Sequence, residues 1–316
     1  MYFPYLRGKQ FELLALKELS PLLGAAKKTL PIIEPVRSPK GSGLDRCLTA
    51  LNAEGLDFIL VMNPSVGALR GAYVADDVAT FVNEHPSSHS WNLGLLLFED
   101  SDVATLINDY ASTVGPGRRL TLIHRGVSQG LDGIPALTAA LQREFDVIDD
   151  ALRQRHFREL RKTTLGVTLH DWFPGEERNS AYLNKLESTF SEDHLYYQEE
   201  GWYGFSDFLT IGEPYSDGGF TPRAVVIHWT YEPAPGKPIM IRHFTSESNA
   251  DTTNVGGKFL EAAGKLVTFL NAHDIHTHAA EVMRSHLENS TYPGLGVVKK
   301  LSIQNHLELM SEILSR

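Results

Sequence analysis

The sequence has very little that would place the protein outside the cytoplasm. It contains one cysteine, Cys47, so no internal disulfide bond can form. Its longest apolar runs, such as Leu93–Phe98 and Phe58–Met62, are far too short to cross a bilayer. No basic segment leads into a long apolar one near Met1, so we expect no secretion signal. These absences predict a cytoplasmic protein that does not span a membrane.

The chain also lacks any excess of positive charge. It carries 29 basic and 39 acidic side chains, a formal net charge of −10, and no long basic run. Such a surface on average repels phosphate backbones, so general coating of nucleic acid is not expected. A local pocket for a small phosphorylated ligand is compatible with this charge.

Several familiar catalytic motifs are missing as well. No Gly-x-Gly-x-x-Gly turn follows an early strand, which argues against a dinucleotide-binding fold. No Gly-x-Ser-x-Gly elbow of a serine hydrolase is present. Cys47 falls within a predicted amphipathic helix without a base beside it, which favours a packing role.

What the sequence does contain is a recurring order of elements, without a repeat of sequence. A short, continuous aliphatic run is followed by a loop and then by a segment of helical periodicity, and 42% of all residues are hydrophobic. Continuous apolar runs are typical of parallel strands that are buried on both faces. The predicted strands are Tyr2–Leu6, Leu30–Val36, Phe58–Met62, Leu93–Phe98, Leu120–His124, Asp146–Asp149, Thr164–His170 and Phe208–Gly212.

Eight such units predict a single (β/α)₈ TIM-like barrel over residues 1–316, because strands that alternate with helices form parallel sheets. Periodicity alone also permits an open, doubly wound sheet, and the count of eight favours the barrel. The predicted helices between the strands are Phe11–Leu23, Leu44–Ala53, Val74–Glu84, Val103–Ala111, Ile134–Phe145, Arg153–Arg161 and Tyr182–Phe190.

The pattern changes after the eighth predicted strand. Ala224–Tyr231 and Pro238–Phe244 are rich in β-formers and are separated by a Pro/Gly turn, which predicts an inserted β-hairpin over residues 224–244. His228 and His243 would be cross-strand neighbours there, where structural histidines are commoner than ligands. Extra helices over residues 257–316 are predicted at Gly257–Ala272, Thr277–Leu287 and Ser302–Leu314.

Ionisable residues follow nearly every predicted strand. In a barrel these positions meet at one rim, where barrel enzymes place their sites. Arginine and lysine can hold a phosphate or carboxylate, which makes Arg7, Lys9 and Arg125 candidate ligand-binding residues. Glu213 and Tyr215, which follow the eighth predicted strand, are candidate ligand-binding residues at the same rim.

Carboxylates at the same rim predict a site for a divalent cation, Mg²⁺ or Mn²⁺, that would assist phosphoester hydrolysis. The candidate metal ligands are Glu34, Glu99, Asp149 and Asp171. His124 and His170 are the candidate general acid or base. The alternative is that these charges neutralise one another in pairs across the rim.

A hypothesis of another class is a non-catalytic protein that binds a protein partner. Tyr196, Tyr197, Trp202, Tyr203 and Phe205 form an aromatic-rich segment, and exposed Tyr and Trp are typical anchors of interfaces. The same side chains would equally serve to cover the end of the barrel.

Four segments carry a resemblance to a known family. They are Tyr-Phe-Pro-Tyr-Leu-Arg-Gly-Lys-Gln-Phe-Glu-Leu-Leu-Ala-Leu from Tyr2, Leu-Pro-Ile-Ile-Glu-Pro-Val from Leu30, Asp207–Glu213 and Gln304–His306. In these motifs the chain resembles the phage-type beta protein family along its whole length.

The resemblance implies a phage or antiviral-defence context. One bacterial branch of that family is often encoded beside a small nuclease-like protein, which implies a protein partner encoded nearby. The family brings no established reaction and no agreed catalytic residues. The positions that the resemblance marks are Arg7, Gly8, Lys9, Gln10, Glu34 and Glu213.

Overall fold

The computed structural model describes residues 1–71, 73–115, 117–152, 164–218 and 221–316. The chain divides into two compact units. The first comprises Met1–Asp171 and Tyr196–Asp207, and the second comprises Trp172–Leu195 and Phe208–Arg316. The assignment of residues 1–316 to a single domain stays a prediction.

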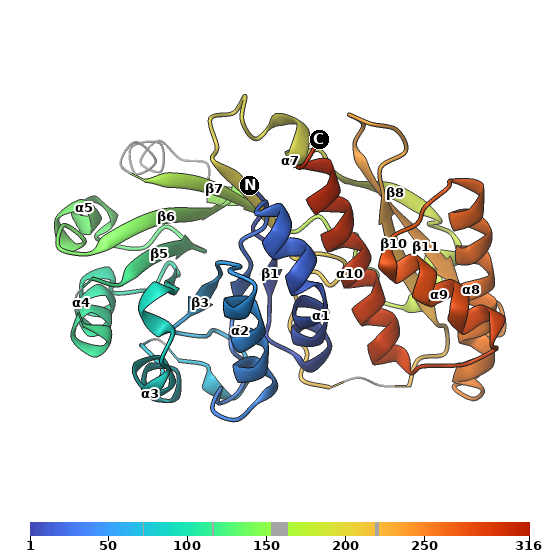
Figure 1. Ribbon diagram of the computed structural model, residues 1–316, viewed down its shortest axis with the longest axis horizontal. Coiled ribbons are helices and arrows are strands. Elements are labelled where there is room, and N and C mark those ends of the chain that lie inside the picture. The colour runs from blue at the N-terminus through green and yellow to red at the C-terminus, as the bar shows by residue number, and fades with distance from the viewer. Residues whose placement is uncertain (72, 116, 153–163, 219–220) are drawn as a thin grey trace. The chain divides into compact units, whose positions relative to one another are not determined.

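The first unit is a TIM-like barrel of eight parallel strands, as the sequence predicts (Figure 1). The strands neighbour one another in chain order, and their central residues are buried. They are β1 (Tyr5–Leu6), β2 (Ile32–Ile33), β3 (Ile59–Val61), β4 (Asn92–Leu97), β5 (Arg119–His124), β6 (Gln142–Asp149), β7 (Leu165–His170) and β9 (Gly204–Asp207).

The first and last strands bring the barrel close to closure. Tyr2 forms a parallel bridge with Phe205 of β9 and another with Thr29, which precedes β2. The backbone N–H of Phe3 donates to the Phe205 carbonyl at 2.8 Å, and the N–H of Phe205 donates to the Met1 carbonyl at 3.1 Å. These bonds satisfy groups that an open sheet edge would leave unpaired.

Helices follow the first strands and lie outside them (Figure 1). Two of them begin at the cap residues that their sequences provide. Ser42 Oγ accepts from the Leu44 N–H at 3.1 Å, and Asp102 accepts from the Thr105 N–H at 3.1 Å. The helices of this unit are α1 (Gln10–Ala26), α2 (Gly43–Ala53), α3 (Asp76–Glu84), α4 (Val103–Val114) and α5 (Ile134–Leu137).

Several predicted elements differ in the structure. The last predicted helix, Ser302–Leu314, begins seven residues earlier, at Leu295. The eighth barrel strand is Gly204–Asp207, and Phe208–Gly212 forms turns instead. The predicted helix Ile134–Phe145 ends at Leu137, because strand β6 already begins at Gln142. Where helix Tyr182–Phe190 was predicted, a short 3₁₀ turn (Asn179–Leu183) precedes a strand. The predicted helix Arg153–Arg161 lies outside the described residues.

The second unit contains a small antiparallel sheet that includes the predicted hairpin. Its strand order is β10 (Val226–Tyr231), β11 (Ile239–Thr245) and β8 (Glu187–Ser191), and the short helix α7 (Asp193–Tyr196) follows β8. His228 lies directly opposite His243, as predicted.

Three C-terminal helices accompany this sheet: α8 (Val255–Ala272), α9 (His278–Glu288) and α10 (Leu295–Ile313). They share one apolar core with it, in which Trp229 and Phe259 are fully buried. Among the described residues, no helix is long and apolar enough to cross a membrane.

The motif residue Asn305 has a structural role in the second unit. Its Nδ2 donates to the carbonyl of Thr230 at 2.8 Å, and its Oδ1 accepts from Thr277 Oγ1 at 3.1 Å. Thr277 in turn caps α9 by accepting from the Ala280 N–H at 3.2 Å. Asn305 therefore joins β10 to the start of α9.

Candidate functional site

The alternation of side chains along strands divides the predicted rim residues into two groups. Neighbours in a strand point to opposite faces, so Arg125 and His124 cannot share a face, nor can Asp149 and Asp150. The rings of Phe3 and Phe145 lie 5.2 Å apart, although β1 and β6 are not neighbours in the sheet order, so both face the inside of the barrel. Tyr5 lies two residues after Phe3 and Asp149 four residues after Phe145, so they share this face, and Arg125 pairs with Asp149. Tyr5 and Arg125 therefore face the inside of the barrel, and His124 faces away from it.

The inward-facing group is built around Glu34, which is fully buried. One carboxylate oxygen accepts from the Tyr5 hydroxyl at 2.8 Å and pairs with Arg7. The other accepts from the backbone N–H of Ser65 at 2.6 Å and from its hydroxyl at 2.7 Å. Each carboxylate oxygen of Glu34 thus has two donors. Burial of the Tyr5 hydroxyl, together with the negative charge of Glu34, raises the pKa of Tyr5 well above its ordinary value.

Arg125 and Asp149 form a second inward-facing pair. The Arg125 Nε lies 3.3 Å from the Asp149 carboxylate, and the Arg125 side chain is only 9% exposed. Arg7 and Arg125 are thus both engaged with carboxylates inside the barrel, which makes them less available to an external phosphate than the sequence suggests.

The two predicted catalytic histidines each contact a carboxylate. His124 Nε2 lies 2.9 Å from Asp146, and both side chains are fully buried. His170 Nε2 lies 3.0 Å from Asp150 and is 6% exposed. Because a general acid must reach its substrate, this burial does not favour the predicted role, which stays a prediction.

The predicted metal ligands do not form a ready donor set. Glu99 and Asp171 are exposed, whereas Glu34 and Asp149 lie inside the barrel in the contacts above. Within the described ranges, no group of three or more His, Cys, Asp or Glu side chains could hold a metal ion. The residues therefore do not fit a Mg²⁺ or Mn²⁺ centre in this arrangement.

Glu213 and Tyr215 belong to the second unit, since the barrel's last strand ends at Asp207. The Tyr215 hydroxyl donates to Asp217, two residues further on. Their predicted role in binding a ligand stays a prediction.

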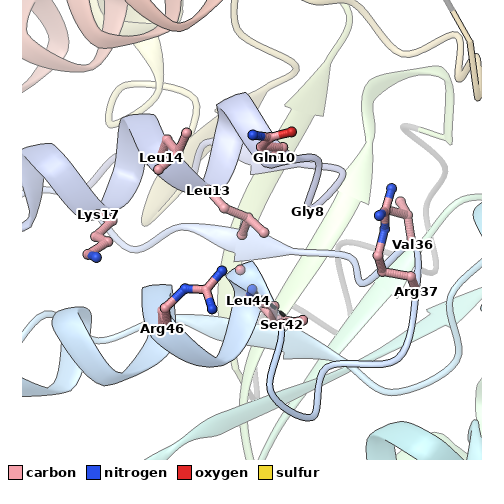
Figure 2. A pocket seen from close by; sticks show the side chains of 11 residues that line it. Gly8, Gln10, Leu13, Leu14, Lys17, Val36, Arg37, Ser42, Leu44 and Arg46 are labelled. Atoms are coloured by element: carbon pink, nitrogen blue, oxygen red, sulfur yellow. Dashed lines mark hydrogen bonds between the residues drawn. The ribbon is translucent and has the colours of Figure 1, made fainter. Parts of the chain in front are cut away.

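A pocket of about 260 Å³ lies between α1 and α2, near the carboxyl ends of β1 and β2 (Figure 2). Three cationic side chains line it: Lys17 from α1, Arg37 from the segment after β2, and Arg46 from α2. Figure 2 shows Lys17 at one end, Arg37 at the other, and Arg46 extending into the space between. The loops after β1 and β2 supply Gly8, Val36, Arg37 and Ser42, and α1 and α2 supply the other lining residues.

The charges of this pocket are not neutralised by the protein. In the part of the chain that the structure describes, Lys17, Arg37 and Arg46 are exposed and form no ion pair. The first 50 residues carry eight basic and four acidic side chains, whereas the other 266 carry 21 basic and 35 acidic ones. A positive pocket therefore sits on an acidic protein, which concentrates anions at this place.

The N-termini of α1 and α2 add to the positive electrostatic potential of this pocket. Gln10, the first residue of α1, and Gly43, the first residue of α2, both line the pocket. Helix N-termini favour negative charge through their free N–H groups and their dipoles. Lys9 is the N-cap residue of α1 and stands between two lining residues, Gly8 and Gln10.

Gly8 is required by the backbone at the edge of this pocket. Its φ is +60°, and a Cβ added there would lie 2.9 Å from the Glu34 carbonyl oxygen. Gly41 has a similar φ of +65° but has open space around it. We expect Gly8→Ala to lower the free energy of unfolding by about 1–3 kcal/mol more than Gly41→Ala, because only Gly8→Ala adds a steric contact. Urea denaturation of both variants measures the difference, and equal losses would contradict the tight contact.

The sequence analysis did not single out Lys17 or Arg46, which lie within predicted helices, or Arg37, although Arg37 directly follows the predicted strand Leu30–Val36. The available signal was the charge imbalance of the first 50 residues against the rest. Gly8 and Gln10, which the family resemblance marks, do line the pocket.

Cys47, near this pocket on α2, is fully buried. Burial raises the pKa of its thiol to about 12. Only the thiolate is a strong nucleophile, so this agrees with the packing role that the sequence favours.

Comparison of the chain with models of protein families, with curated proteins and with solved structures finds no match. The resemblance to the beta protein family stays a prediction, and the function is argued from the residues themselves.

Proposed function

We propose that this barrel binds a phosphate-bearing ligand in the pocket between α1 and α2. The observation that carries the proposal is that Lys17, Arg37 and Arg46 surround one cavity and form no ion pair within the described chain, although the protein has a net charge of −10. Three cations at one place repel one another, and a bound anion removes this repulsion.

A phosphate group fits this site better than a single carboxylate. Two of the three cations are arginines, whose planar guanidinium groups can each contact a phosphate through two N–H groups. A ligand with two or more negative charges can interact with more than one of these cations. The nearby starts of α1 and α2 favour the same kind of group.

Binding, rather than hydrolysis, is the function that the arrangement favours. A phosphoester hydrolase needs a general acid or base, or a metal, within reach of the ligand. Here His124 is buried against Asp146, and both oxygens of Glu34 already accept two hydrogen bonds or ion pairs. A phage or antiviral-defence role would rest on the family resemblance alone.

The rival function, capture of a protein partner by the aromatic segment, is less favoured. Of its five side chains, Tyr197, Trp202 and Phe205 are buried. The Phe205 ring packs against Tyr2, with centroids 5.4 Å apart, and against Tyr197 at 5.1 Å. Only Tyr196 and Tyr203 are exposed, which leaves little aromatic surface for a partner.

Inorganic pyrophosphate is a suitable probe of the proposed site. At a concentration of 100 times its dissociation constant it should stabilise the protein by about 2.7 kcal/mol, because it binds only the folded state. Arg46→Gln should remove most of this gain. A rise in thermal midpoint with pyrophosphate, beyond that in sodium chloride of equal ionic strength, measures the effect.

Arg70→Gln is the matched control, since Arg70 is also exposed and forms no ion pair in the described chain. It should respond to pyrophosphate as the unaltered protein does. Equal stabilisation of the two variants, or no stabilisation beyond the salt control, would refute the proposed site.

A further inference from the structure

The α1–α2 pocket has an apolar side that an inorganic anion would leave uncovered. Leu13 and Leu14 of α1, Val36 after β2 and Leu44 of α2 line it together with the three cations. Leu13, Val36 and Leu44 are only 4–5% exposed, so the half-buried Leu14 offers the most surface of these four side chains to a ligand. A ligand that covers these side chains gains binding free energy because it removes their apolar surface from water.

The size of the cavity limits the ligand. Its volume of about 260 Å³ lies just below the roughly 300–1,000 Å³ typical of pockets for drug-sized ligands. A whole dinucleotide cofactor would not be enclosed here, which agrees with the absence of a dinucleotide-binding turn in the sequence. A ligand of about the size of one nucleotide is the largest that the pocket can enclose.

The order of the lining groups limits the ligand further. Lys17 and Arg37 lie at opposite ends of the pocket, and Leu13 and Leu44 lie between them (Figure 2). An alkyl phosphate would place its apolar tail against one of the end cations and remove water from that charge, which costs free energy. A ligand with polar atoms at both ends and a flat apolar middle avoids this loss.

We infer that the pocket binds a nucleoside phosphate, with its phosphates at the cations of one end and a face of the base against the leucines. This inference rests on the proposed function, because it specifies the ligand of the same site. Leucine and valine side chains offer no hydrogen-bonding groups to the edge of a base. Purine and pyrimidine nucleotides should therefore bind with affinities within about tenfold of each other, since every base has an apolar face.

Isothermal titration calorimetry of the full chain tests the inference with five probes: adenosine diphosphate, cytidine diphosphate, inorganic pyrophosphate, adenosine and octyl phosphate. We expect both nucleotides to bind at least about tenfold more tightly than pyrophosphate, adenosine or octyl phosphate, because only they engage both sides of the pocket. Octyl phosphate binding as tightly as adenosine diphosphate would overturn the nucleoside assignment.

Two leucine variants on α1 test the contribution of the apolar side of the pocket separately from that of the cations. Leu14→Asn, inside the pocket, should weaken adenosine diphosphate at least about threefold and leave pyrophosphate unchanged. Leu22→Asn is the control, because Leu22 lies on α1, is 42% exposed and does not line the pocket. It should change neither affinity.

The outcomes separate this inference from the proposed function. If pyrophosphate binds in an Arg46-dependent manner and as tightly as adenosine diphosphate, the inference is wrong and the proposed anion site stands. If no phosphate compound binds in an Arg46-dependent manner, both are wrong.

Discussion

Replacement of Glu34 by leucine should lower the free energy of unfolding by about 3–5 kcal/mol, the usual cost of removing one partner from a buried ion pair. Arg7 would then keep its charge inside the barrel without the carboxylate that faces it. The Tyr5 hydroxyl and the Ser65 hydroxyl would lose their acceptor at the same time. Urea denaturation followed by circular dichroism measures the loss.

A double variant shows whether the charge of Arg7 causes this loss. In Arg7→Met/Glu34→Leu the uncompensated cation is gone, so we expect the double variant to be more stable than Glu34→Leu alone. If the two single losses simply add, the pair is not coupled and the explanation is wrong. Glu84→Leu is the surface control: Glu84 pairs with Lys40 at 2.8 Å in solvent, and its loss should change stability little.

Acidification should destabilise the protein through the histidine pair of the second unit. The Nδ1 atoms of His228 and His243 lie 2.8 Å apart, so one ring donates and the other accepts, and neither favours a second proton. The rings of Phe173 and Tyr182 pack around His228, and Tyr182 also contacts His243. Burial lowers the pKa of His228 from 6.5 to about 3, and His243 adds to this shift. Burial also lowers the pKa of His243 to about 4, with Lys185 lowering it further and Glu176 opposing the shift.

Acidification destabilises the fold because the unfolded chain binds protons on these histidines at a higher pH than the folded chain does. Below pH 6.5 the unfolded chain takes up a proton on each histidine, whereas the folded chain does so only near pH 3 to 4. Stability from the pair is therefore complete above pH 6.5 and is lost as the pH falls toward 4. Each histidine contributes up to about 1.4 kcal/mol per pH unit over this window.

The double variant His228→Asn/His243→Asn tests this assignment. Two asparagines can keep a cross-strand hydrogen bond but do not titrate, so the loss of stability between pH 7 and pH 4.5 should be smaller than in the unaltered protein. His89→Asn alters an exposed histidine and should leave the pH dependence as it is. Identical pH dependence in all three proteins would show that the pair does not carry the effect.

Two errors in the predicted elements share a physical cause. In both strands, polar side chains form hydrogen bonds or ion pairs with residues that are distant in the sequence. Strand β9 contains Ser206 and Asp207, which look unlike a buried strand. Ser206 Oγ donates to the Phe3 carbonyl at 2.5 Å, and Asp207 accepts from the Tyr2 hydroxyl at 2.7 Å. Strand β6 begins with polar Gln142–Glu144, and Glu144 pairs with Arg119 of β5 at 2.7 Å. These partners lie far away in sequence or on another strand, so local patterns could not reveal them.

The sequence by itself determined the alternation of strands and helices, the hairpin and the C-terminal helices, because buried parallel strands need continuous aliphatic runs and helices need their own period. It favoured the barrel over an open sheet only through the count of strands, and the closure by β9 was decided by the tertiary structure. Its composition also determined that the chain is acidic and has one cysteine. Which charged residues are available to a ligand was decided by the tertiary structure. Inside the barrel, Arg7 pairs with Glu34 and Arg125 pairs with Asp149. Lys17 of α1 and Arg46 of α2 instead line one pocket, because the two helices pack side by side. An ion pair depends on distances of a few ångströms between side chains, and only the folded chain fixes those distances.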